Sequence, residues 1–117
     1  MAIVGVGAIG SHLAEMLAKL GVRRFTLIDP DEVDTINLSV QGFYESEIGR
    51  TKTSAVADRI AAIDSRARVA TWANHYENLV HGIEGVPAEA AVFACVDSMR
   101  VRRRLFRDFA ERDWPVF

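Results

Sequence analysis

The stretch from residue 2 to residue 21 reads AIVGVGAIGSHLAEMLAKLG and decides the fold. Residues 2–6 form a short apolar run that predicts a buried strand, and apolar side chains then recur at helical spacing. The predicted core-facing stripe of this helix consists of Ile9, Leu13, Met16, Leu17 and Leu20. Gly21 follows the stripe, where a glycine commonly ends a helix. The stretch is therefore interpreted as a strand, a tight turn and an amphipathic helix.

The turn has the pattern G-x-G-x-x-G and runs Gly5-Val6-Gly7-Ala8-Ile9-Gly10. In this context Gly5 makes the tight turn, Gly7 lets backbone amides approach a phosphate, and Gly10 lets the helix pack closely on the sheet. The helix N-terminus adds unpaired N–H groups and a positive dipole end, which both favour an anion. The pattern predicts a phosphate-binding turn; a plain strand–helix turn made of small residues is the alternative.

Beyond this unit, apolar runs and helical patterns continue to alternate along the chain. Strands are predicted at 25–28, 68–72 and 90–96, helices at 51–63 and 98–112, and another strand begins at 115–117. Residues 30–50 are interpreted as a long polar segment, and residues 75–87 as a loop with one helical turn. The run at 90–96 lacks alternation, which is typical of a parallel strand covered on both faces. This order predicts an α/β fold with a Rossmann-like, doubly wound parallel sheet in three layers.

The length and composition restrict the function classes. A chain of 117 residues predicts one domain, and we expect residues 1–117 to be a fragment truncated at the C-terminus, because the chain stops as a strand begins. The net charge of -2 excludes a bulk nucleic-acid binder. The single cysteine, Cys95, excludes an intramolecular disulfide and a multi-cysteine zinc site within this stretch. The absence of a signal peptide and of a spanning apolar run predicts a cytoplasmic protein without membrane contact.

Two groups of acidic residues follow predicted strands. Asp29 lies 19 positions after Gly10, at the end of the second strand, where a carboxylate accepts hydrogen bonds from ribose hydroxyls. The alternative role for Asp29 is that of a turn former before Pro30. For Asp31 and Asp34, a solvated acidic loop explains the sequence equally well.

Lys52 begins the second predicted helix, where its charge opposes the helix dipole. An anionic ligand nearby explains that position, and a solvated surface lysine is the alternative. Asp97 and Ser98 follow the fourth strand, at the carboxyl edge of the sheet, where open α/β sheets bind ligands. Asp97 is a candidate ligand for Mg²⁺, a hard cation that takes carboxylate and phosphate oxygens together. Its alternative role is to cap the following helix.

Five motifs, taken together, resemble those of the ThiF/MoeB/E1 superfamily, the adenylyltransferases that activate ubiquitin-like and sulfur-carrier proteins. The motifs are Gly5-Val6-Gly7-Ala8-Ile9-Gly10-Ser11, Leu27-Ile28-Asp29-Pro30-Asp31, Asn37-Leu38, Gly49-Arg50-Thr51-Lys52 and Cys95-Val96-Asp97-Ser98. They cover nearly the whole chain in the right order. The Asp-x-Asp followed by Asn-Leu is a feature that ordinary dehydrogenases lack.

The resemblance implies an ATP-dependent adenylation. The C-terminal carboxylate of a small partner protein, typically ending in Gly-Gly, attacks the α-phosphate of ATP, and pyrophosphate leaves. By this resemblance Lys52 and Asp97 are catalytic, Lys52 stabilising charge on the α-phosphate and Asp97 binding Mg²⁺. The implied nucleotide-binding residues are Gly5, Gly7, Ala8, Ile9, Gly10, Asp29, Asp31, Asn37, Lys52 and Asp97. The resemblance also implies a homodimer, and the cut-off strand at 115–117 leaves a sheet edge that favours association.

One departure from the family pattern concerns the phosphates. The family has an Arg two residues after Asn-Leu, and here Val40 stands in its place. Losing a charge-assisted phosphate contact costs about 1.5–3 kcal/mol. Arg50 is a candidate substitute. The family's zinc-binding and thioester cysteines fall outside this stretch, so zinc is expected only there.

Two further function classes remain open from the residues. The glycine turn and Asp29 suit NAD as well as ATP, so an NAD-dependent oxidoreductase domain is the alternative, although Lys52 and Asp97 have no role in hydride transfer. Val40 motivates a non-catalytic nucleotide-binding member. Cys95 is expected to be buried and unreactive. The arginines of the helix at 98–112 are interpreted as a solvated face, except that the resemblance gives Arg102 a functional claim, because the family often has an Arg five residues after the metal-binding Asp. The histidines His12, His75 and His81 form no recognisable ligand spacing.

Overall fold

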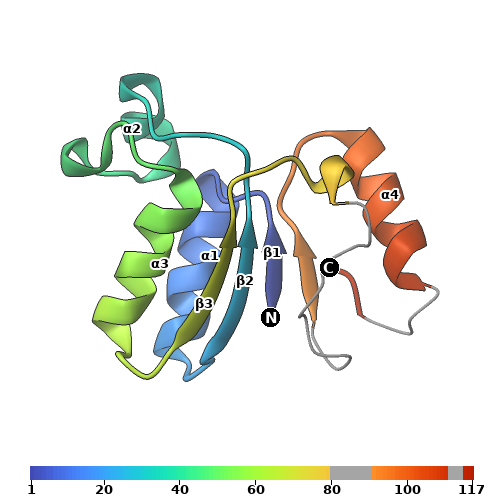
Figure 1. Ribbon diagram of the computed structural model, residues 1–117, viewed down its shortest axis with the longest axis horizontal. Helices are drawn as coiled ribbons and strands as arrows, with labels where there is room; N and C mark the ends of the chain where they lie inside the picture. The colour runs from blue at the N-terminus through green and yellow to red at the C-terminus, as the bar shows by residue number, and fades with distance from the viewer. Residues whose placement is uncertain (80–90, 111–114) are drawn as a thin grey trace.

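The computed structural model describes residues 1–79, 91–110 and 115–117 (Figure 1). Its strands are β1 (Ala2–Val4), β2 (Arg24–Ile28), β3 (Arg68–Trp72) and β4 (Val92–Ala94). Its α-helices are α1 (Ala8–Lys19), α2 (Thr35–Gln41), α3 (Lys52–Ile63) and α4 (Met99–Ala110). Two short 3₁₀ turns are η1 (Glu45–Glu47) and η2 (Tyr76–Asn78). The alternation of strands and helices confirms the predicted α/β class, and β4 is shorter than predicted.

The strands form one parallel sheet in the order β3-β2-β1-β4. Residues 115–117 lie beside β4 in the parallel sense: the Val92 N–H donates to the Pro115 carbonyl at 3.0 Å, and the Phe117 N–H donates to the Val92 carbonyl at 2.8 Å. The beginning of the predicted last strand is therefore confirmed. In Figure 1, α1 and α3 cover one face of the sheet and α4 covers the other, which gives the expected three layers.

Two apolar clusters lie on opposite faces of the sheet. Ile3 and Leu27 pack with Val56 and Ile60 of α3, whereas Ala2 and Val4 pack with the α4 side. The α4 cluster is completed by Ile28, Tyr76, Val92, Leu105 and Phe109. Because β1 is buried on both faces, its apolar sequence does not alternate with polar residues.

The prediction for the core-facing side of α1 is wrong in part. Ile9, Met16 and Leu20 are 60–80% exposed. The buried residues of the helix are Gly10, Ser11, Ala14 and Ala18, with Leu13 and Leu17 partly buried against the core. The helix lies so close to the sheet that only small side chains fit in the contact. Large apolar residues therefore flank the contact or face outward.

The segment at 30–50 contains more structure than the sequence predicted. It holds α2 and η1, and both Val33 and Phe43 are buried. The structure describes all seven residues of α2, and none of them is buried. The helix shows no core-facing stripe in the sequence because it lies on the outside of the molecule, above α1 and α3 in Figure 1. We call residues 34–48 the α2 lobe.

Arg59 of α3 fastens the α2 lobe to the helices beneath it. Its guanidinium donates to Glu47, to Glu15 Oε1 of α1 at 2.9 Å and to the Gly42 carbonyl at 3.1 Å. It also lies over the rings of Phe43 and Tyr44, at 5.1 and 4.6 Å from their centroids. The hydrogen bond from Arg59 lowers the pKa of Glu47 below its ordinary value. One cation thus joins three elements of the chain.

We predict that Arg59→Leu lowers the free energy of unfolding by about 2–3 kcal/mol, because two carboxylates lose their partner in a poorly hydrated site. Since the pKa of Glu47 is lowered in the folded state, its contribution is present above the unfolded pKa and is lost as the pH falls through the folded pKa. The difference from the wild type, measured by urea unfolding, is expected to shrink between about pH 6 and about pH 3. A constant difference across that range contradicts the assignment.

Candidate functional site

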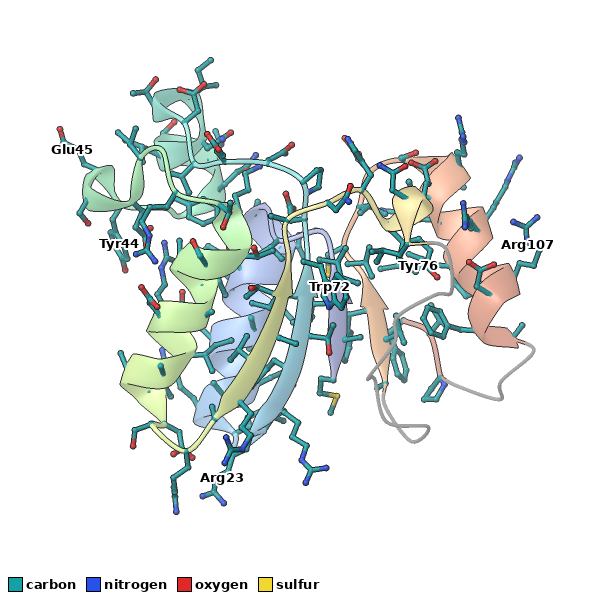
Figure 2. All side chains as sticks on the ribbon, in the orientation of Figure 1. Arg23, Tyr44, Glu45, Trp72, Tyr76 and Arg107 are labelled. Atoms are coloured by element: carbon teal, nitrogen blue, oxygen red, sulfur yellow. The ribbon has the colours of Figure 1, made fainter. Side chains whose placement is uncertain are left out.

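A cleft of about 640 Å³ lies at the carboxyl ends of the strands, where the residues following β1, β2, β3 and β4 converge. The glycine turn and the residues that follow β2 and β3 belong to its lining. The η2 turn lies beside α4; Tyr76, labelled in Figure 2, is buried there and donates from its hydroxyl to Asp108 of α4 at 3.1 Å. The lining includes Gly5, Gly7, Ala8, Ile9, Asp29, Asp31, Gln41, Lys52, Asn74, His75, Tyr76, Glu77, Cys95, Val96, Asp97, Ser98 and Arg102.

The glycine turn has the geometry that close packing demands. A Cβ on Gly10 would lie 1.9 Å from the Gly5 carbonyl oxygen, so the first turn of α1 sits directly on the end of β1. Gly5 has φ +90°, and a Cβ there would lie 2.6 Å from the Cys95 carbonyl oxygen. At Gly7 the nearest atom is Gln41 Oε1 at 3.6 Å, an ordinary contact distance. Gly5 and Gly10 therefore shape the turn, and Gly7 faces the cleft.

Asp29 is buried at the end of β2 and organises the backbone around it. Its Oδ2 accepts from the Val6 N–H at 2.6 Å, and its Oδ1 accepts from the Asp31 N–H at 2.9 Å. The turn-forming role suggested by the sequence is thus present. It leaves room for the ligand role, because each carboxylate oxygen has a second lone pair and Asp29 lines the cleft.

Lys52 is buried, so the surface-lysine alternative is wrong. Its Nζ donates to Asp31 Oδ2 at 2.8 Å; the Lys52 side chain is 4% exposed and that of Asp31 is 61% exposed. The backbone holds the same pair together, since the Lys52 N–H donates to the Asp31 carbonyl at 3.0 Å. Thr51 caps α3 by accepting from the Ser54 N–H at 3.3 Å. A cation is therefore fixed in the lining of the cleft to which the glycine turn also belongs.

The sequence left two roles open for Asp97, that of a Mg²⁺ ligand and that of a helix cap. In the structure the neighbouring residue, Ser98, caps the helix. Ser98 Oγ accepts from the Val101 N–H at 3.4 Å and caps α4. Asp97 is exposed in the cleft, and its carboxylate has no hydrogen-bond partner among the described residues. Arg102 reaches back from α4 and donates to the Val96 carbonyl at 2.7 Å. The Asp97 oxygens are thus available to a cation, although the described residues contain no group of three metal-ligating side chains.

The region around α2 departs from the expectations in three ways. Val40 is 65% exposed and lines no part of the cleft, and Asn37 lines an adjoining cavity instead. Arg50 does not replace the missing arginine, because its guanidinium pairs with Asp58 at 2.6 Å. Gln41, which the sequence analysis did not select, lines the cleft, and its buried Oε1 has no hydrogen-bond partner among the described residues.

Other residues of the cleft also lacked a sequence signal. Asn74, His75 and Glu77 line it because they follow β3 at the carboxyl edge of the sheet. Their position directly after a predicted strand is the one sequence feature that could have identified them. His81 lies outside the described residues. Cys95 was expected to be buried, and the structure shows it half-buried. This burial raises the pKa of the Cys95 thiol, which argues against a role as a nucleophile.

The model of the ThiF family matches residues 1–117. Ubiquitin-like modifier-activating enzyme 5 from Drosophila persimilis is 30% identical over 113 residues, covering 87% of this chain and 29% of that protein. The enzyme of the same name from Rattus norvegicus is 31% identical over 114 residues, covering 87% of this chain and 28% of that protein. The chain thus spans less than a third of these relatives.

Solved structures with a similar fold cover almost the whole of this chain. E. coli tRNA N6-threonylcarbamoyladenosine dehydratase, TcdA, in complex with ATP has a TM-score of 0.87 at 28% identity, covering 98% of this chain and 48% of that one. E. coli MccB with AMPCPP and MccA has a TM-score of 0.84 at 26% identity, covering 98% of this chain and 34% of that one. Within the described residues, no helix combines the length and the apolar character needed to cross a bilayer.

The glycine geometry predicts destabilisation of different size at two positions of the motif. Gly10→Ala is expected to lower the free energy of unfolding by at least about 3 kcal/mol, because its Cβ overlaps a backbone carbonyl that cannot move aside. Gly7→Ala is expected to cost less than about 1 kcal/mol, because its Cβ meets only ordinary contacts. Urea unfolding of both variants measures the difference. Equal destabilisation contradicts the assigned roles.

Proposed function

Because the chain belongs to the ThiF family, we propose that it is the nucleotide-binding part of an adenylyltransferase that activates the C-terminal carboxylate of a ubiquitin-like or sulfur-carrier protein. The observation that carries this proposal is the buried Lys52, fixed by Asp31 in the same cleft as the glycine turn. The curated relatives are named as activating enzymes of ubiquitin-like modifiers. Members with known structure were solved with ATP and with AMP.

The residues of the cleft suit the binding of an adenine nucleotide across the carboxyl edge of the sheet. The Asp29 carboxylate accepts hydrogen bonds from the ribose hydroxyls, and the N-terminus of α1 faces the first phosphate. Gly7 permits close approach of that phosphate because it carries no side chain. This arrangement orients the α-phosphate toward Lys52, whose own position is set by Asp31.

Adenylation then proceeds by attack of a carboxylate oxygen of the partner on the α-phosphorus. The bond to the bridging oxygen breaks, pyrophosphate leaves with its electron pair, and the acyl-adenylate forms. Lys52 stabilises the negative charge on the phosphoryl oxygens as it develops, which lowers the barrier without a strong base. The ion pair with Asp31 holds the Lys52 ammonium in place before the reaction begins, so little reorganisation is needed.

Asp97 fits the role of the Mg²⁺ ligand. Its carboxylate faces the cleft without a protein partner among the described residues, because Ser98 caps the helix instead. A single carboxylate together with phosphate oxygens is an ordinary donor set for Mg²⁺. When bound, the ion neutralises charge on the phosphates. We also propose that the protein forms the homodimer that the resemblance implies.

We predict that the chain is stabilised by Mg²⁺-ATP and not by NAD. At a ligand concentration of about 100 Kd, binding to the folded state adds about 2.7 kcal/mol, which raises the melting temperature of a domain of this size by roughly 10 °C. Differential scanning fluorimetry with each ligand, and with neither, measures the shift. A larger shift with NAD than with Mg²⁺-ATP supports the oxidoreductase alternative and overturns the proposed function.

Lys52→Met is expected to slow ATP–pyrophosphate exchange by at least about 100-fold while changing the Kd for Mg²⁺-ATP by less than about threefold. The reason is that Lys52 faces charge that grows in the transition state. The assay uses the full-length protein with a Gly-Gly-terminated carrier. Lys19→Met is a matched control, since Lys19 is the other lysine of the chain and lies at the exposed end of α1. Equal losses in binding and exchange rule out this role for Lys52.

A further inference from the structure

Helix α4 carries more positive charge than its surroundings neutralise. It holds five arginines and one aspartate, whereas the whole chain has a net charge of -2. Arginines three and four positions apart on a helix are neighbours, and their repulsion opposes the helix. A negatively charged partner relieves this repulsion.

Two of the five arginines remain available to a partner. The other three are engaged within the chain: Arg100 with Glu77 at 3.0 Å, Arg102 with the Val96 carbonyl at 2.7 Å and Arg104 with Asp108 at 3.3 Å. Arg107 lies 3.7 Å from the same Asp108. In the part of the chain that the structure describes, Arg103 forms no ion pair.

The charged face of α4 also exposes large apolar side chains. Leu105 and Phe109 are buried in the cluster against the sheet. Met99 and Phe106, on the opposite side of the helix, are 58% and 52% exposed. Arg107, labelled in Figure 2, points away from the sheet as well. Methionine, aromatic residues and arginine are the types enriched at protein–protein interfaces, so this composition favours a protein partner.

The spacing of the exposed residues favours a helix as the partner. Positions 99, 103, 106 and 110 follow one another at intervals of four, three and four residues, which is the spacing at which two helices pack along a seam. We call this stripe the α4 seam; it consists of Met99, Arg103, Phe106 and Ala110, and all four are exposed. The positions that flank the seam hold Arg100, Arg102 and Arg107. Charges at such flanking positions determine which helix pairs with which.

The charge decides between the possible occupants of the seam. A second copy of α4 brings arginines against arginines in either orientation, so the seam does not fit its own copy. A nucleic acid satisfies the arginines, but its hydrated phosphates leave Met99 and Phe106 without an apolar contact. A helix with apolar residues along its seam and carboxylates beside them satisfies both kinds of side chain.

We infer that the α4 seam binds an acidic amphipathic helix of another protein. The apolar side chains of that helix cover Met99 and Phe106, and its carboxylates pair with Arg103 and Arg107. None of these four residues lines the nucleotide cleft, so the inference stands apart from the proposed function.

The test is fluorescence anisotropy of the full-length protein with labelled peptides about three heptads long, at low ionic strength. The acidic probe has Leu at the seam positions and Glu at the flanking positions. One comparison peptide has Lys in place of Glu, and another has Ala in place of Leu. We expect the acidic probe to bind at least about tenfold more tightly than either comparison peptide, and its affinity to fall as salt is added.

Variants of α4 locate the binding. Arg103→Gln with Arg107→Gln is expected to weaken binding of the acidic probe by at least about fivefold, and so is Phe106→Ala. Arg103→Lys with Arg107→Lys keeps the charge and is expected to retain most of the affinity. Arg24→Gln with Arg68→Gln is the matched control, since it removes the same charge at exposed positions of β2 and β3; we expect a change below about twofold. All the substituted side chains are exposed, and thermal melts check that each variant is folded.

Each other outcome overturns the inference. Equal affinities for the Glu and Lys peptides show that charge does not select the partner. A loss in the control as large as in the α4 variants shows that the peptide responds to net charge alone. Oligouridylate that binds more tightly than the acidic probe, and is lost in the Arg103→Gln, Arg107→Gln variant, identifies a nucleic-acid surface instead. If no peptide binds, the seam is a solvated face, and the proposed function stands unaffected.

Discussion

The fold depends on how closely α1 approaches the end of β1. The space at Gly10 is so small that a single carbon would overlap the Gly5 carbonyl oxygen. This contact fixes the direction of α1 and brings its N-terminus over the carboxyl edge of the sheet. It also selects the small residues Ser11, Ala14 and Ala18 for the buried side of the helix.

A second constraint joins the two sides of the segment that holds the α2 lobe. The Val33 N–H donates to the Arg50 carbonyl at 2.8 Å, and the Lys52 N–H donates to the Asp31 carbonyl at 3.0 Å. These short antiparallel contacts bring residues 31–33 and 50–52 together, so residues 34–48 protrude as a loop that is closed at its base. The same contacts bury Lys52 next to Asp31. Backbone pairing, rather than the ion pair alone, therefore determines where this cation sits.

Sequence reasoning succeeded where a pattern has a direct physical cause. The strand–turn–helix at residues 2–21 was predictable, since glycine spacing and apolar runs follow from packing. The parallel class followed from the alternating order of strands and helices and from the run at 90–96 that lacks alternation. It failed for the buried side of α1, because periodicity indicates large apolar residues while close packing requires small ones. It missed α2, whose residues contact solvent on most sides. Gln41 and the residues after β3 were missed because only the three-dimensional arrangement brings them to the cleft.

The way in which the α2 lobe is attached has a consequence for how the protein can change over evolutionary time. The lobe's helix contributes no buried residue, and the lobe is fastened through the Arg59 contacts with Glu47 and Gly42 together with the buried Val33 and Phe43 at its base. Substitutions at the exposed positions of the helix therefore carry almost no penalty for folding, whereas Leu38 is partly buried against the core. Exposed positions such as Val40 can therefore change while the scaffold stays intact. In this architecture, sequence changes are tolerated best at positions whose side chains do not pack in the core.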